Sequence, residues 1–235
     1  MRDTLNTENN YHELILKKEG FIKEDIAEYL DNQDWDVERV RDQFSTICMY
    51  SYQILISKYS LGLKVSDIQN DYKKTVSFME KGWESVSGYV EMVWMLSIGI
   101  MLNVEDEEFS KLTELVRRDQ LDDYLINFLI AAKKPDWELH SKNFRFPKPY
   151  KALEEVIELS ASTSGKAVER LKKYLQKEWY PGHKDSGWHD DHKSKWGVHF
   201  GYWSFESGAL VKLLGLDDTE IKDMNYYPYD MVHYK

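Results

Sequence analysis

Residues 86–104 form the segment that most restricts how this chain can fold. Apolar side chains cover nearly every side of this segment when it is drawn as a helix. A helix without a polar face has to be surrounded by other elements, so we predict a central, buried helix. Its longest apolar run, residues 92–102, has about half the length that a bilayer crossing requires. The segment therefore belongs to a protein core and not to a membrane.

Amphipathic helices are predicted on both sides of this central segment. Between Ile68 and Trp83 the apolar positions advance in steps of four and three, which is the seam of a helix lying along another helix. No strand alternation of useful length occurs, and the chain has only 5 prolines. We therefore predict an all-α fold, a multi-helix bundle of stacked helical hairpins with no significant sheet.

The stretch Gly201–Asp218 predicts a buried helix with clear ends. Apolar residues recur every four positions, and Gly215 stands where helices commonly stop in a left-handed residue. Asp217 and Glu220 have the spacing of a capping box, which predicts a second helix starting immediately. Glu206 lies among apolar neighbours, where a carboxylate is costly to bury alone. We expect Glu206 either to be paired or to belong to a site.

Charge and cysteine content limit the classes of partner. Acidic residues outnumber basic ones 41 to 31, which gives a formal net charge of -10. This charge disfavours direct binding of nucleic acid or an anionic membrane surface and favours a basic protein partner. The single cysteine, Cys48, excludes an internal disulfide and falls on an apolar helical face. The N-terminal residues lack an apolar export segment, so we expect a cytoplasmic protein.

The loop from His183 to His199 is the one stretch that resembles a chemical site. It could hold a metal ion or supply general acids and bases, although its spacing does not place two histidines on one rigid helix face. The alternative is a hydrogen-bonded loop that covers the end of the 201–214 helix. We predict no bound metal and no cofactor. The polar residues of the loop are His183, Asp185, His189, Asp190, Asp191, His192 and His199.

Other catalytic patterns are absent from the sequence. It has no phosphate-binding glycine loop, no Gly-x-Ser-x-Gly elbow and no paired-cysteine zinc pattern. This shifts the expectation toward a protein that works by binding. The tyrosine-rich tail, residues 225–234, is interpreted as a terminal segment pinned across the core, with a partner contact as the alternative.

Several motifs in order resemble the C-terminal half of the PoNi family. PoNi proteins are the immunity proteins paired with PoNe polymorphic nuclease effectors, which bacteria deliver into competitors. The resemblance is specific over roughly residues 121–234, whereas the N-terminal half is similar in its helical pattern only. The motifs are Trp188-His189-Asp190, Gly201-Tyr202-Trp203-Ser204-Phe205-Glu206 with Gly208-Ala209-Leu210, Leu214-Gly215-Leu216-Asp217-Asp218, and Tyr226-Tyr227-Pro228-Tyr229-Asp230.

The resemblance implies a helical cytoplasmic protein that binds a DNase toxin and blocks it, without catalysis of its own. It also implies an N-terminal helical region, residues 1–118, and a PoNi-like C-terminal region, residues 119–235, packed as one compact unit. The shared aromatic motif is then architectural, with these members in this chain: Trp188, Tyr202, Trp203, Phe205, Glu206, Asp217, Tyr227 and Tyr229.

A contact mechanism follows from charge. A DNase holds phosphates in a basic groove, and an acidic protein competes with DNA for those charges. Each acidic cluster can instead be a solvated face or a helix start. Two other functions stay open: a metal-dependent hydrolase that uses the His183–His199 loop with Glu206 as base, and a helical scaffold for another protein. The candidate toxin-binding residues are Glu105, Asp106, Glu107, Glu108, Asp122, Asp123, Asp185, Asp190 and Asp191.

Overall fold

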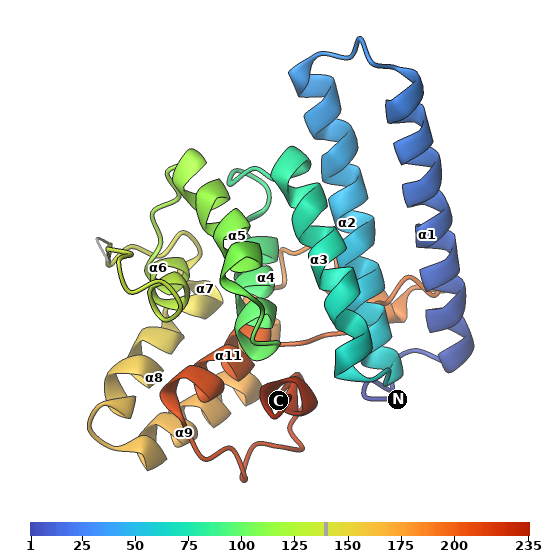
Figure 1. Ribbon diagram of the computed structural model, residues 1–235. Coiled ribbons are helices and arrows are strands. Elements are labelled where there is room, and N and C mark those ends of the chain that lie inside the picture. The colour runs from blue at the N-terminus through green and yellow to red at the C-terminus, as the bar shows by residue number, and fades with distance from the viewer. Residues whose placement is uncertain (139–140) are drawn as a thin grey trace. The chain divides into compact units, whose positions relative to one another are not determined.

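The computed structural model describes residues 1–138 and 141–235, and these residues form helices and loops with no strand (Figure 1). The all-α prediction is confirmed. A π-helical turn, η1 (Tyr174–Glu178), joins α9 to α10, and η2 (Asp191–Lys193) is a single 3-10 turn. The α-helices are α1 (Glu8–Asp31), α2 (Val37–Leu61), α3 (Val65–Gly82), α4 (Tyr89–Met101), α5 (Asp106–Arg118), α6 (Tyr124–Ala131), α7 (Pro147–Tyr150), α8 (Ala152–Ser160), α9 (Ser164–Lys173), α10 (Trp179–Gly182), α11 (Phe205–Leu214) and α12 (Tyr229–Val232).

The chain divides into two compact units, and it passes from one to the other inside α4 and inside α5. The division into residues 1–118 and 119–235 stays a prediction about sequence regions. Unit 1 consists of Met1–Glu91, Ser110–Asp119 and Asp190–Tyr202, and unit 2 consists of Met92–Phe109, Gln120–His189 and Trp203–Lys235.

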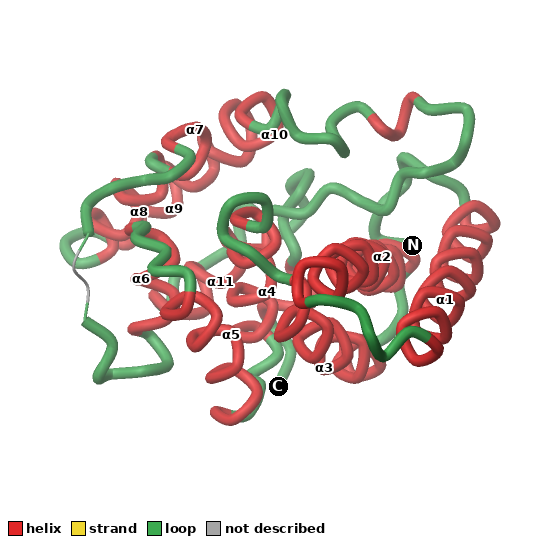
Figure 2. The backbone as a smooth tube through the Cα atoms, turned by 90° about the horizontal axis from the view of Figure 1, so that it is seen from above, coloured by secondary structure: helices red, strands yellow, loops and turns green. Residues whose placement is uncertain are grey.

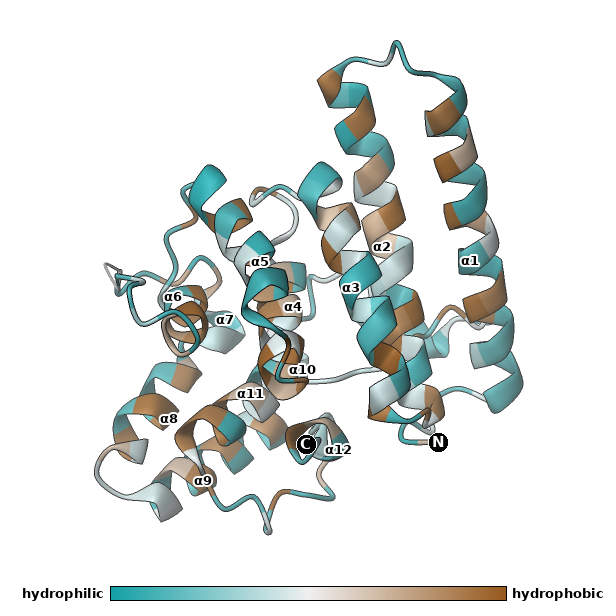
Figure 3. Ribbon diagram, viewed as in Figure 1, coloured by the Kyte–Doolittle hydropathy of each residue, from teal (hydrophilic) through white to brown (hydrophobic). Residues whose placement is uncertain are grey.

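In unit 1, the long helices α1, α2 and α3 lie with α2 in the middle (Figure 1). Figure 2 views these helices nearly end on. Thr7 and Asp36 cap α1 and α2 by accepting backbone N–H groups, from Asn10 and Arg39 respectively. Gly62 ends α2 in the left-handed region, at φ 100°, where other residues are strained. Figure 3 shows hydrophobic and hydrophilic residues alternating along α1, as in an amphipathic helix.

The seam predicted for α3 forms as expected. Ile68, Tyr72, Val76 and Met79 are each fully buried. Between α2 and α3 the buried hydroxyls of Ser51 and Thr75 lie 2.6 Å apart, and Thr75 also donates to the Asp71 carbonyl. These two buried hydroxyls are therefore hydrogen-bonded, as burial requires.

The buried helix predicted within residues 86–104 is confirmed for α4, because every residue from 92 to 102 is buried. Val86 precedes the helix and is 79% exposed, so the first residues of the predicted segment do not belong to it. In unit 2, α11 packs against α8 and α12. Gly208 in α11 allows the close approach of Pro228 and Val232, since a Cβ there would overlap both side chains. The tail is thus anchored on α11, with Met231 fully buried.

The second helix predicted after Gly215 does not form. Gly215 ends α11 at φ 61°, as predicted, but residues 216–228 are turns and loop. The Asp217 carboxylate accepts hydrogen bonds from the N–H and the hydroxyl of Thr219, two residues on. Asp217 therefore forms a local turn instead of capping a helix, a competition that its side chain commonly wins.

Cys48 is buried in the core of unit 1, as predicted, and burial raises the pKa of its thiol to about 12. It is therefore a packing residue and not a reactive thiol. Among the residues that the structure describes, no helix combines the length and the apolar character that a membrane crossing needs.

Candidate functional site

The loop predicted as a possible chemical site is shared between the two units. His183, Asp185 and His189 belong to unit 2, whereas the segment from Asp190 to His199 belongs to unit 1. Across the described residues, no group of three or more His, Cys, Asp or Glu side chains is placed to hold a metal ion. The loop therefore has to be considered as two separate polar clusters.

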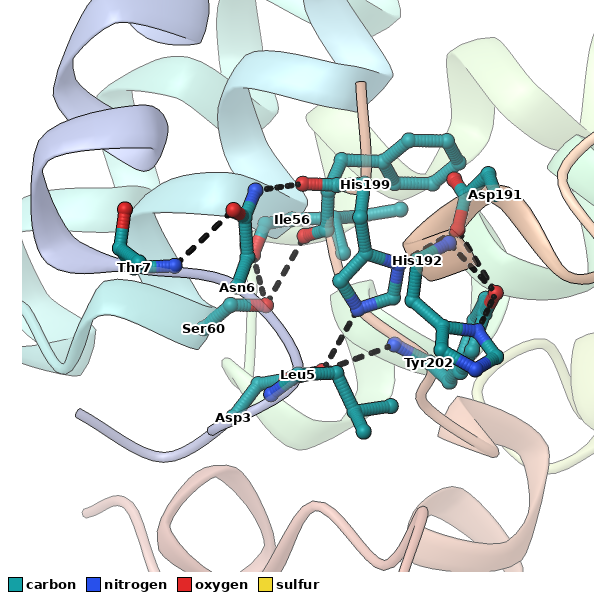
Figure 4. Close-up of polar contacts among 11 residues, drawn as sticks. Asp3, Leu5, Asn6, Thr7, Ile56, Ser60, Asp191, His192, His199 and Tyr202 are labelled. Atoms are coloured by element: carbon teal, nitrogen blue, oxygen red, sulfur yellow. Dashed lines mark hydrogen bonds and ion pairs between the residues drawn. The ribbon is translucent and has the colours of Figure 1, made fainter. Parts of the chain in front are cut away.

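In unit 1, His199 is buried between two carboxylates (Figure 4). Its Nε2 lies 3.1 Å from Asp3 Oδ2, and its Nδ1 lies 2.5 Å from Asp191 Oδ1. Although burial alone lowers a histidine pKa, the two carboxylates raise the pKa of His199 to about 9. At neutral pH the ring is an imidazolium that donates from both nitrogens.

Two further side chains complete this arrangement. The Tyr202 hydroxyl donates to Asp191 at 2.7 Å, and His192 Nδ1 lies 2.9 Å from the same hydroxyl. We call Asp3, Asp191, His192, His199 and Tyr202 the His199 cluster. It joins the N-terminal residues to the segment before α11 through charge-assisted hydrogen bonds within unit 1, so its first role is to hold that unit together.

Backbone contacts beside the cluster strengthen the same connection. The Asn6 side-chain amide donates to the His199 carbonyl at 2.8 Å, and the Ser60 hydroxyl donates to the Phe200 carbonyl at 2.9 Å (Figure 4). Both contacts are buried and join residues far apart in the sequence. The segment 199–202 is thereby fixed on α2 and the N-terminal residues.

In unit 2, Glu206 is fully buried in the first turn of α11. Its Oε1 accepts hydrogen bonds from Tyr174 at 2.9 Å and from Ser204 at 2.7 Å. Burial raises the pKa of Glu206 above its usual value, against the opposing effect of these donors and of the Trp179 indole. Glu206 Oε2 makes no hydrogen bond of normal geometry. The sequence predicted that Glu206 is either paired or part of a site. Pairing is confirmed for Oε1.

Trp179, a neighbour of this carboxyl group, packs among other aromatic rings. Trp179 stacks on Trp188 with ring centroids 5.7 Å apart and packs on Tyr226 at 4.7 Å. His183 is buried beside them, with Nδ1 2.7 Å from the Trp179 carbonyl and Nε2 3.0 Å from the Tyr150 hydroxyl. We call Tyr174, Trp179, Ser204 and Glu206 the Glu206 cluster.

Burial lowers the pKa of His183 to about 4, so this ring is neutral at physiological pH. With Nδ1 donating to a carbonyl, Nε2 accepts a hydrogen bond from the Tyr150 hydroxyl. Both nitrogens are thus used in hydrogen bonds. His183 is a packed and hydrogen-bonded core residue of unit 2.

The remaining aromatic motif residues divide by burial. Tyr202, Trp203, Phe205 and Tyr227 are buried. The Tyr227 hydroxyl donates to Asp218 at 2.6 Å, so the tail is tied down by a polar contact as well as by packing. Trp188 and Tyr229 are half-buried, and Asp217 is exposed.

Among the acidic candidates, Glu105, Asp106 and Glu107 are exposed and Glu108 is half-buried at the start of α5. We call these four residues the α5 acidic cluster. Asp106 lies 3.5 Å from Lys134 Nζ, a solvent-exposed pair of small energetic value. The carboxylates also suit the positive end of the helix dipole, so a structural role coexists with their exposure.

Two acidic candidates are corrected by the structure. Asp123 is fully buried as the N-cap of α6, where it accepts hydrogen bonds from the N–H groups of Ile126 and Arg145. The Asp191 side chain is 9% exposed and paired with His199. Neither carboxylate is available to an external partner. The signal for Asp123 was present in the sequence, since an aspartate directly before an apolar helical segment is a typical N-cap.

The other acidic candidates keep some exposure. Asp122 and Asp185 are exposed in unit 2. Asp190, in unit 1, adopts a left-handed backbone conformation at φ 64° and pairs with Lys193 at 2.8 Å. Of the acidic candidates, the α5 acidic cluster offers the longest uninterrupted run of carboxylates to a partner.

Comparison with solved structures finds a similar fold. The crystal structure of protein PA2201 from Pseudomonas aeruginosa is similar over 82% of this chain and 73% of that one, with a TM-score of 0.64 and 20% identity. At this level of identity the likeness concerns the fold alone. No curated protein matches the sequence.

Family models match nearly the whole chain. The model of the PoNe immunity protein (PoNi) N-terminal region matches residues 2–114, and the model of the C-terminal region matches residues 121–231. The resemblance inferred from the C-terminal motifs is therefore confirmed and extends to the N-terminal half. The chain belongs to the PoNi family, the immunity proteins that act against PoNe nuclease toxins.

Proposed function

We propose that this protein binds a cognate DNase toxin in the cytoplasm and inhibits it by covering the DNA-binding or active site. The match of both PoNi regions is the observation that carries this proposal. The formal net charge of -10 supports it, because an acidic protein is attracted to a basic surface built to hold DNA.

The α5 acidic cluster is our first choice for the contact surface. Glu105 and Glu107 are exposed and make no ion pair in the described structure, so both carboxylates are available to a cationic groove. Asp122 and Asp185 are secondary candidates on the same grounds of exposure. Carboxylates that replace phosphates in such a groove exclude DNA by competition and speed association by steering.

No catalytic role is proposed for this chain. Glu206, the residue considered as a base, is fully buried and accepts hydrogen bonds from Tyr174 and Ser204. A general base must lie within hydrogen-bond reach of its substrate. The burial of Glu206 supports a structural role for the aromatic motif and a binding role for the protein.

The test is a binding and protection experiment. The purified protein is mixed with the nuclease encoded beside its gene, the affinity is titrated, and cleavage of DNA is followed at increasing molar ratios. We expect tight binding and loss of cleavage at stoichiometric ratio. The double variant Glu105→Lys/Glu107→Lys should bind with a faster dissociation rate and protect less.

A matched control separates the effect of a lost contact on binding from the effect of a changed net charge. Glu80→Lys/Glu169→Lys changes the net charge equally at two exposed acids that make no ion pair in the described structure. Because a lysine at a helix start costs stability, urea unfolding of both variants has to accompany the binding data. No binding by the wild type rejects the proposed function for that pair, and equal binding by both double variants rejects the α5 acidic cluster as the contact.

A further inference from the structure

A groove in unit 1 has no role in the function described so far. It runs along α2, where Ser51 and Ile54 form its floor, and has a volume of about 400 Å³. One wall is α1, which contributes Ile22 and Ile26, and the other is α3, which contributes Phe78. The two walls stand on either side of α2 in Figure 1. We call this feature the α2 groove.

The walls of the α2 groove are apolar and only partly covered. Ile22, Ile26 and Phe78 are each half-buried, whereas Ile54 at the floor is 5% exposed. Ile22 also packs against the buried cluster that contains Ile54. The groove therefore extends from the core of unit 1 to its surface, and apolar side chains entering it would remove this surface from water.

A charged bridge lies at one end of the groove. There Lys58 Nζ lies 2.9 Å from Asp71 on α3 and 3.5 Å from Glu19 on α1. Along α1 the lining extends from Glu19 to Ile26, which is about 10 Å or two helical turns. The groove thus has the length of about two turns of a docked helix.

The unpaired charges beside the groove are positive. The two acids that line it, Glu19 and Asp71, both pair with Lys58. Lys23 on α1 and Lys74 on α3 line the groove, and in the described structure their ammonium groups take part in no ion pair. In a protein with a net charge of -10, two unpaired ammonium groups on opposite walls of one apolar groove select a partner segment that is apolar and acidic.

We propose that the α2 groove docks an amphipathic, acidic helix of the toxin. The apolar side chains of that helix enter between Ile26 and Phe78, and its carboxylates meet Lys23 and Lys74. This is the helix-in-groove mode of recognition, with one apolar row and charged flanks. The inference rests on the proposed toxin-binding function and adds a second contact surface, of opposite charge to the α5 acidic cluster.

The first test reverses the two unpaired charges. Lys23→Glu/Lys74→Glu is compared with Lys64→Glu/Lys73→Glu, which makes the same change of net charge at exposed lysines that do not line the groove. Binding of the full chain to the purified neighbouring nuclease is measured by titration calorimetry. We expect the Kd to rise about tenfold for the groove variant relative to the control, since two exposed attractions become repulsions.

A second variant tests occupancy of the groove independently of charge. Ile26→Trp adds apolar volume at the wall and should weaken binding by filling the space that the docked helix needs. Hydrogen exchange of the complex should show protection at residues 19–26 and 71–78, which line the groove. Thermal unfolding checks that each variant is folded, and sedimentation checks whether the wild type self-associates.

The outcomes separate the two proposals. If the wild type does not bind the nuclease, the proposed function fails, and this inference fails with it. If the wild type binds, and both groove variants bind as tightly as the control without protection of the groove, the inference alone is overturned. Loss of a homodimer in the groove variants, with toxin binding unchanged, would overturn it in favour of a second copy of this chain.

Discussion

The His199 cluster and the Glu206 cluster differ in whether a buried ionisable group has a partner of opposite charge. Each one buries ionisable side chains supplied by the motif-rich stretch between Trp188 and Glu206. In unit 1 a histidine is placed between two carboxylates, and the pKa of His199 is raised to about 9, so its ring carries a compensated charge. In unit 2 a single carboxyl group has no cationic partner, and burial raises the pKa of Glu206.

The difference shows that burial does not by itself decide protonation. The partners decide it, because a charge that is compensated and hydrogen-bonded stays ionised, while an uncompensated one favours its neutral form. The two clusters should therefore respond in opposite directions when charge is removed.

Removal of the His199 ring should have the largest effect. In His199→Ala, Asp3 and Asp191 stay buried without the cation between them, and the aromatic contact with Tyr202 is lost. We expect the free energy of unfolding to fall by about 3–5 kcal/mol. Urea unfolding at pH 7 measures it.

His233→Ala is the matched control for that variant. His233 also pairs with a buried carboxylate, Asp218, at 3.0 Å, but its own side chain is 50% exposed. We expect a loss below about 1 kcal/mol. Equal losses of unfolding free energy in the two variants would show that burial of the His199 cluster adds nothing to stability. The comparison between the two clusters would then be wrong.

Stability should also depend on pH through His199. Its folded pKa of about 9 exceeds the reference value of 6.5, so the folded state binds the proton more tightly. The stabilisation is therefore complete below pH 6.5 and is lost as the pH rises through 9. We expect a decline of up to about 3 kcal/mol across this window. Unfolding at pH 6, 8 and 9.5 measures it, and His199→Ala should lack this component.

The amino-acid pattern predicts the architecture better than it predicts the polar sites. Helical periodicity indicated the central helix and the seam of α3, because the burial of many side chains determines both. Asp217 has the same capping spacing as a helix start but forms a turn with Thr219. Local hydrogen bonding by an aspartate is compatible with either outcome, so spacing alone does not decide between them.

The polar clusters could not be predicted from the sequence, because their members lie far apart along the chain. Asp3 and His199 are separated by 196 residues, and Tyr174 and Glu206 by 32. No periodic pattern reports such pairs. Glu206 was still recognisable as exceptional, since a carboxylate between aromatic and small residues needs compensation. The sequence thus identified Glu206 as unusual, and the structure identified its hydrogen-bond partners.

Two tyrosines allow the comparison to be repeated with a smaller change. Tyr202 donates to the ionised Asp191, and Tyr174 donates to Glu206. A hydrogen bond to a charged group contributes more than one to a neutral group, so Tyr202→Phe should cost about 1.5–3 kcal/mol and Tyr174→Phe about 0.5–1.5 kcal/mol. Thermal or urea unfolding gives both values. The reverse ranking would mean that Glu206, and not Asp191, is the ionised acceptor.

Replacement of Glu206 by glutamine should have the smallest effect. The amide oxygen can keep the hydrogen bonds from Tyr174 and Ser204, and no charge is left to desolvate. We expect Glu206→Gln to be neutral or up to about 1 kcal/mol more stable than the wild type at pH 7.

Its pH dependence provides the internal control. Because the folded pKa of Glu206 is raised, the wild type loses stability as the pH rises from the usual glutamate value of 4.5 through the folded one, and the glutamine variant should not. The gain should therefore vanish in acid, below pH 4.5. A loss above about 2 kcal/mol at pH 7 in folded Glu206→Gln would show that this carboxyl group is held as a compensated anion. The two clusters would then follow the same principle, and the contrast between them would be wrong.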